Sequence, residues 1–151
     1  SGLAVPAISL HAPTQELREK LMPKAARVAP LPELIASLDA YPLKSRERVT
    51  YEYIMLGGVN DTIAQAKQLV ILLWQKSFKF NLIGYNPPTP EVAHNPPYRA
   101  PEQADVLAFE DYLRSKSITT FIRRSMGQDI AAACGQLKLL AGGELGGQGA
   151  K

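Results

Sequence analysis

The stretch that decides the fold is Val49-Thr50-Tyr51-Glu52-Tyr53-Ile54-Met55-Leu56-Gly57-Gly58-Val59-Asn60-Asp61. Its first eight residues are rich in β-branched and aromatic side chains, which favour a strand. Gly57 and Gly58 predict a turn, and Asn60 or Asp61 can cap a following helix. That helix is expected to run to about Gln75 and to bury Ile63, Ala66, Val70, Leu73 and Trp74.

The same alternation of strand and helix extends in both directions. Further strands are expected at residues 3–10, 78–85 and 118–123, and helices at 14–21, 32–41 and 101–115. Pro6 suggests a strand start or an edge strand, and Pro23 is expected to stop the first helix. Strands that alternate with helices indicate an α/β fold with a parallel sheet of about four strands. Four strands are too few to close a barrel, so an open sheet or part of a barrel is expected.

Composition sets limits on the class of protein. A chain of 151 residues with 46% hydrophobic and 21% charged residues suits one soluble domain. Its single cysteine excludes an internal disulfide. One cysteine and two histidines are also too few ligands for a zinc cluster. A net charge of +3 permits an anionic partner without requiring one. No apolar run is long enough to span a bilayer, so no membrane partner is expected.

Loops that follow parallel strands emerge at the same edge of a sheet, where ligand sites collect. The residues in those positions are Ser9, Leu10 and His11; Gly57 and Gly58; Asn86; and Ser125 to Asp129. Each has a purely structural explanation, since Asn86 before Pro87 is also a good turn former and Asp129 is also a helix cap. Together they predict a site at this edge.

The stretch around the cysteine allows the same two interpretations. Cys134 follows three alanines, where a cysteine is usually a small buried hydrophobic residue. Arg123 and Arg124 are either a solvated strand end or a contact for an anion. Glu52 has no second carboxylate at a recognisable spacing, so it does not indicate acid–base catalysis.

Four motifs occur in an order that matches a known family. They are Ser9-Leu10-His11-Ala12-Pro13, Glu52 to Leu56 with Gly58-Val59-Asn60-Asp61, Asn81-Leu82-Ile83 with Tyr85-Asn86-Pro87, and Gly127 to Leu137. Together they resemble the C-terminal half of the RlmN/Cfr-type radical S-adenosylmethionine methyltransferases. That resemblance implies the C-terminal part of a radical-SAM partial (β/α)6 barrel over residues 1–138, followed by a flexible glycine-rich tail over 139–151.

The resemblance also implies a role for each motif. Ser9, Leu10, His11 and Asn86 match residues that bind S-adenosylmethionine. Cys134 matches the cysteine that carries a methyl group to a ring carbon of adenine, C2 in one type of enzyme, in rRNA or tRNA. Arg123 and Arg124 become candidate RNA contacts. The family's Cys-x-x-x-Cys-x-x-Cys motif, which binds a 4Fe-4S cluster, is not in this sequence, so no metal ligand is expected in the chain.

We therefore expect part of an RNA adenine methyltransferase that needs S-adenosylmethionine, a 4Fe-4S cluster and the N-terminal half of the same protein. Alone, the chain is expected to be inactive. Its partners would be rRNA, tRNA or ribosomal particles, in the cytoplasm or an organelle. The alternative is a degenerate, non-catalytic homologue that binds RNA or ribosomes as an assembly factor. A third possibility is a generic α/β domain in which Cys134 is inaccessible and Ser9, His11 and Asn86 lie far apart.

Overall fold

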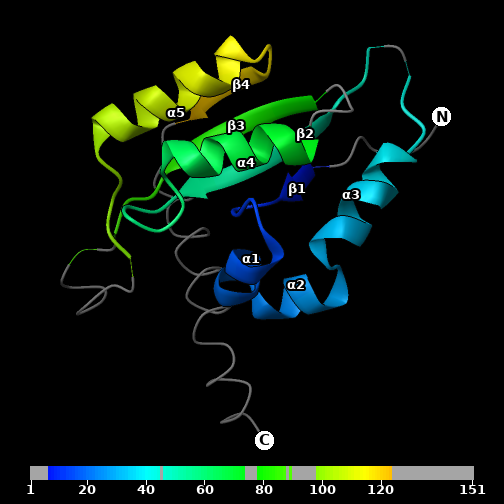
Figure 1. The fold of residues 1–151 in the computed structure, drawn as a ribbon, viewed down its shortest axis with the longest axis horizontal. Coiled ribbons are helices and arrows are strands. Elements are labelled where there is room, and N and C mark those ends of the chain that lie inside the picture. The colour runs from blue at the N-terminus through cyan, green and yellow to red at the C-terminus, as the bar shows by residue number, and fades with distance from the viewer. Residues whose placement is uncertain (1–6, 45, 74–77, 88, 90–97, 124–151) are drawn as a thin grey trace, which may run out of the picture.

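The computed structural model describes residues 7–44, 46–73, 78–87, 89 and 98–123. Its elements, in chain order, are β1 (Ala7–Ser9), α1 (Gln15–Leu21), α2 (Pro23–Val28), α3 (Leu31–Asp39), β2 (Val49–Met55), α4 (Ile63–Leu73), β3 (Phe78–Gly84), α5 (Gln103–Ser115) and β4 (Thr119–Arg123). The four strands form one parallel sheet in the order β1-β2-β3-β4 (Figure 1). The predicted α/β fold with a four-stranded parallel sheet is confirmed.

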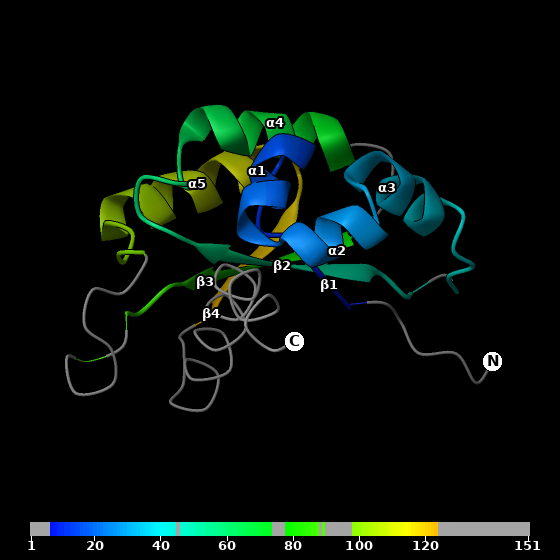
Figure 2. The same cartoon turned by 90° about the horizontal axis from the view of Figure 1, so that it is seen from below.

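The helices gather on one side of the sheet (Figure 2). Alternate residues of β2 and β3 face them, because successive side chains of a strand point to opposite faces. Tyr53 and Phe80 are fully buried there, and the Tyr53 ring lies 5.5 Å from the rings of both Phe80 and Phe109, measured between centroids. The main core therefore lies between the sheet and helices α3, α4 and α5.

A second cluster lies where the strands end. Leu21 and Met22, from the end of α1, pack there with Ile54, Leu56 and Tyr85. We call this end of the sheet, just after Ser9, Met55, Gly84 and Arg123, the carboxyl edge. The cluster anchors the loops that leave β2 and β3 at the carboxyl edge.

The turn between β2 and α4 differs from its prediction. Thr62, rather than Asn60 or Asp61, caps α4: its Oγ1 accepts the Gln65 N–H at 3.2 Å, and the Gln65 Oε1 accepts the Thr62 N–H at 3.0 Å. This reciprocal arrangement is a capping box. The sequence prediction was wrong because the side chains of Asn60 and Asp61 are engaged inside the turn.

Three other predictions need correction. Pro23 does not only end the first helix but also begins α2, since the fixed φ of proline suits the first turn of a helix. On α4, Ile63 was expected to be buried but is 38% exposed, whereas Leu69, six residues later, is fully buried although it was not predicted to be. Of the predicted strand at residues 3–10, the structure describes residues 7–9 as β1, which pairs with β2 at the sheet margin.

Several predictions fall outside the described residues. These are Trp74, most of the proline-rich loop between Asn86 and Pro101, Arg124, the segment Ser125 to Asp129, Cys134 and the tail 139–151.

Candidate functional site

The first candidate segment, Ser9-Leu10-His11, leaves β1 at a sharp bend. The Leu10 N–H still donates to the Glu52 carbonyl at 2.9 Å, as in a regular parallel pair. His11 then has a φ of 61°, in the left-handed region that non-glycine residues seldom occupy. The next ladder donor, the Ile54 N–H, is accepted at 3.0 Å by Nδ1 of the His11 ring rather than by a backbone carbonyl. The imidazole thus extends the β1–β2 pairing by one bond after the backbone has turned away.

Asn60, in the turn after β2, stabilises the place where the backbone bends away at the end of β1. We call this place the corner. The fully buried Asn60 side chain donates through Nδ2 to the carbonyls of His11 and Ile54, both at 2.8 Å, and accepts the Leu56 N–H through Oδ1 at 2.7 Å. Its own carbonyl accepts the Tyr53 hydroxyl at 2.7 Å. Because buried backbone groups must be paired, Asn60 replaces the ladder partners that these residues lose where β1 and β2 diverge.

The electrostatics keep His11 neutral. Burial, together with a smaller effect of the nearby positive charge of Arg18, lowers the pKa of His11 from 6.5 to about 4. Arg18 is itself buried, which lowers its pKa. Its guanidinium donates to the carbonyls of Ala29 at 3.1 Å and Ser9 at 3.4 Å. Both side chains therefore fix the path of the Ser9–His11 segment.

The three residues of this segment face different surroundings. Leu10 is fully buried in the main core and His11 is 3% exposed, so neither side chain is open to solvent. Ser9 is partly exposed and lies in register with Glu52 of β2, which in turn pairs with Asn81 of β3. Its neighbours Ile8 and Leu10 face the helices, so Ser9 points to the opposite face of the sheet.

That opposite face carries polar residues that the sequence analysis did not select. Glu52 accepts a hydrogen bond from Arg123 of β4, with Nη1 and Oε2 3.1 Å apart and both side chains part-exposed. Asn81 of β3 lies in register with Glu52, and Arg123 lies in register with Ile83, two residues further along β3 on the same face of the sheet. The signal was available, because Glu52 and Asn81 alternate with the core residues of their strands. We call Ser9, Glu52, Asn81 and Arg123 the polar row.

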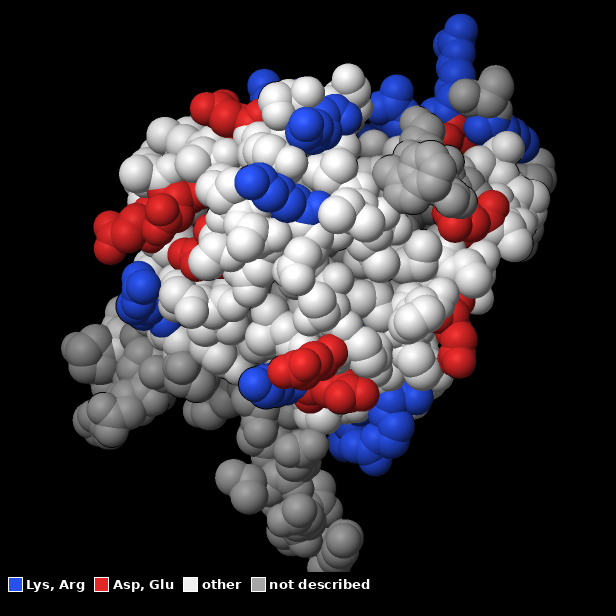
Figure 3. Space-filling model, in the orientation of Figure 1, with Lys and Arg blue, Asp and Glu red and all other residues white. Residues whose placement is uncertain are grey.

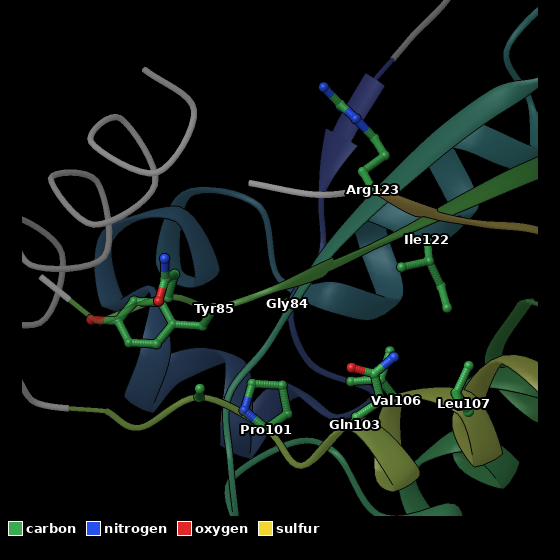
Figure 4. Close-up of a pocket in the computed structure, with 10 residues that line it drawn as sticks. Gly84, Tyr85, Pro101, Gln103, Val106, Leu107, Ile122 and Arg123 are labelled. Atoms are coloured by element: carbon green, nitrogen blue, oxygen red, sulfur yellow. The ribbon is translucent and has the colours of Figure 1, made fainter. Parts of the chain in front are cut away.

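A pocket of about 400 Å³ lies at the ends of β3 and β4, between these strand ends and α5. Figure 4 shows Ile122 pointing toward Val106 and Leu107, while Arg123 points to the other side of the strand. The pocket is lined by Gly84, Tyr85, Asn86, Ala100, Pro101, Gln103, Val106, Leu107, Ile122 and Arg123. Two candidate residues, Asn86 and Arg123, therefore border one cavity.

The remaining candidate residues lie across the sheet from this cavity. Ser9 ends β1 and Asn86 follows β3, with β2 between them. Neighbouring strands are about 4.8 Å apart, so β1 and β3 are roughly 10 Å apart, and Asn86 lies five residues beyond Asn81, the β3 residue in register with Ser9 through Glu52. The segments that carry the described candidates all leave the parallel sheet at the carboxyl edge, and their joint role in one site stays a prediction. The structure also shows that the His11 ring is a structural group there.

Other kinds of site find no support in the described residues. No group of three or more histidine, cysteine, aspartate or glutamate side chains is placed to hold a metal ion there. In the same ranges, no helix has the length and apolar character needed to cross a membrane. On the face shown in Figure 3, basic and acidic residues are interspersed, so this face has no extended basic patch.

Comparison with a solved structure gives the class of protein. A radical SAM methyltransferase from Sphaerobacter thermophilus superposes with a TM-score of 0.76 and 42% sequence identity, over 91% of this chain and 39% of that one. Fold and sequence together therefore relate the chain to the radical SAM methyltransferases. No family model matches the chain.

Sequence relatives give the family within that class. The chain is 56% identical over 147 residues to the dual-specificity RNA methyltransferase RlmN of Nitratidesulfovibrio vulgaris strain Miyazaki F, covering 97% of this chain and 38% of the relative. It is 58% identical over 138 residues to RlmN of Oleidesulfovibrio alaskensis, covering 91% and 37%. The chain is thus similar to part of the RlmN-type dual-specificity RNA methyltransferases and spans less than half the length of these relatives.

Proposed function

We propose that this chain forms part of a methyltransferase that adds a methyl group to a ring carbon of adenine, of the C2 type, in rRNA or tRNA. The observation that carries the proposal is the 56% identity to an RlmN-type enzyme over nearly the whole chain. The loops that carry Ser9 and Asn86 both leave the sheet at the carboxyl edge, which supports a shared ligand site there.

The carboxyl edge suits S-adenosylmethionine, whose ribose hydroxyls and aminocarboxylate group need polar partners. In this proposal the Ser9 hydroxyl and backbone groups of Leu10 and His11 hold one end of the cofactor, and the Asn86 amide holds the other. Glu52 and Asn81 lie in register with Ser9 and add an acceptor and an amide to the same surface. Bent backbone beside a ligand is typical of functional sites, and the left-handed His11 fits that description.

Cys134 is proposed to carry the methyl group on its sulfur before the group reaches the adenine. A thiolate is a good acceptor for a methyl group, and this is the chain's single cysteine. An iron–sulfur cluster needs several cysteine ligands, so the residues present do not fit a 4Fe-4S cluster. Its ligands would come from the family's Cys-x-x-x-Cys-x-x-Cys motif in another segment. The chain alone should then give no methylated adenine.

A chimera tests the proposal. The segment of the Nitratidesulfovibrio vulgaris enzyme that matches this chain is replaced by residues 1–151, and methyladenosine in rRNA and tRNA is measured by mass spectrometry. We expect methylation by the chimera, and none after Cys134→Ala in the same chimera. A chimera that folds and binds S-adenosylmethionine but methylates no adenine would overturn the proposal.

A further inference from the structure

Arg99 occupies an unusual position at the carboxyl edge. Its carbonyl accepts the Gly57 N–H at 2.9 Å, so the segment that precedes α5 is tied to the end of β2. Its guanidinium lies against the glycine pair. A Cβ atom added at Gly57 would lie 2.6 Å from Nη1 of Arg99, and one added at Gly58 would lie 3.0 Å from Nη2. A side chain at either position would displace the guanidinium from this place, and at Gly57 it would also meet the Ala100 carbonyl oxygen at 2.5 Å.

The preceding residue helps to fix this arrangement. Tyr98 packs edge-to-face against Tyr85, with ring centroids 6.2 Å apart, and it joins the cluster at the carboxyl edge. The backbone at Arg99 is therefore held by the packing of Tyr98 on one side and by the hydrogen bond from Gly57 to its own carbonyl. An arginine restrained in this way loses less conformational entropy when it binds a ligand.

The charge of Arg99 is not neutralised by a carboxylate among the described residues. Its guanidinium is exposed and donates to the neighbouring Ala100 carbonyl at 3.3 Å. Arg123, the other described arginine at the carboxyl edge, is instead paired with Glu52. Arg99 is thus the better placed of the two to receive an anion, although the sequence motifs pointed to Arg123.

We propose that Arg99 binds a backbone phosphate of an RNA strand that lies across the carboxyl edge, a role that rests on the proposed function. A guanidinium presents a planar fork of N–H donors that matches two phosphate oxygens. Because Gly57 and Gly58 have no side chains, no side chain of this pair stands in the way of a phosphodiester that approaches the guanidinium. Contacts of this kind position RNA rather than read its sequence.

The test measures binding of a fluorescein-labelled, mixed-sequence single-stranded RNA to the 151-residue chain at several KCl concentrations. Arg99→Ala should raise the Kd for RNA several-fold. It should also make the negative slope of log K against log salt shallower by about 0.7, the value for one phosphate contact on a single strand. Arg99→Lys should keep the slope. Arg27→Ala removes the same charge from an exposed position on α2 and should behave like the wild type.

Each outcome is decisive. An unchanged slope in a folded Arg99→Ala variant, or no salt-dependent RNA binding by the wild type, would overturn the inference. A second series replaces KCl with potassium phosphate at equal ionic strength. Extra displacement by phosphate that disappears in Arg99→Ala would support the inference, because inorganic phosphate then competes with RNA for Arg99. Phosphate binding that is lost in Arg99→Ala, together with an unchanged RNA salt slope, would assign Arg99 to free phosphate instead of RNA. Methylation by the chimera is a separate readout, so failure of the proposed function is distinguishable from failure of this inference.

Discussion

The buried His11 ring makes the stability of the fold depend on pH. Its Nδ1 atom accepts the Ile54 N–H, so a proton added to Nδ1 would place two donors against each other. The pKa of His11 is lowered from 6.5 to about 4 by burial and by Arg18. An unfolded chain therefore binds this proton more readily than the folded protein between these two values. The folded protein should lose stability as the pH falls through this range.

The size of the effect follows from the two pKa values. At pH 5 a histidine with the ordinary pKa is about 97% protonated, whereas one with a pKa near 4 is about 9% protonated. The difference corresponds to about 2 kcal/mol of unfolding free energy lost between pH 7.5 and pH 5. The contribution of His11 is complete above pH 6.5 and disappears progressively below it.

Urea unfolding at pH 7.5 and pH 5 measures this change in the wild type and two variants. His11→Asn has no group that titrates in this range, and asparagine tolerates the left-handed backbone. Its loss of stability should be smaller than that of the wild type by about 2 kcal/mol. His94→Gln removes the chain's other histidine and should retain the wild-type pH dependence. Equal pH dependence in the wild type and His11→Asn would refute the reasoning.

Two further predictions concern the corner around β2. Asn60→Ala leaves one buried N–H and two carbonyls without their partner. In urea titrations this substitution should lower the unfolding free energy by about 3 kcal/mol. A loss below about 1 kcal/mol would contradict this prediction and would show that water replaces the amide. Gly57→Ala places a Cβ atom 2.5 Å from the Ala100 carbonyl oxygen and should lower Tm, whereas Gly84→Ala, with nothing within 4 Å of its Cβ, should leave Tm nearly unchanged. Equal Tm values for these two variants would contradict the close approach at Gly57.

Local patterns in the sequence were sufficient for the architecture. The alternation in Val49–Met55 and the apolar runs around Phe80 and Phe109 placed the four strands and four of the five helices to within a few residues, and only α2 was missed. They also predicted that Ser9 and Asn86 emerge at the same edge, since parallel strands leave no other choice.

Contacts between distant residues could not be predicted in this way. The bond between His11 and Ile54 joins positions 43 residues apart, and the pair of Arg123 with Glu52 joins positions 71 apart. Asn60 was interpreted as a helix cap because that is the local use of an asparagine before a helix. Two of its side-chain partners, Ile54 and Leu56, are local, but the third, the His11 carbonyl, is 49 residues away and is brought to Asn60 only when β1 lies beside β2.

The corner held by Asn60 also restricts how this sequence can change. A replacement at position 60 must at once donate to two carbonyls and accept one N–H in a space with no exposure to water. Among the standard side chains only an amide does both, and glutamine is one methylene longer in a closely packed site. Aspartate cannot donate, and aliphatic residues can do neither. Few single substitutions at position 60 should therefore preserve the fold, whereas the exposed residues of α2, such as Arg27, can vary with little effect on stability.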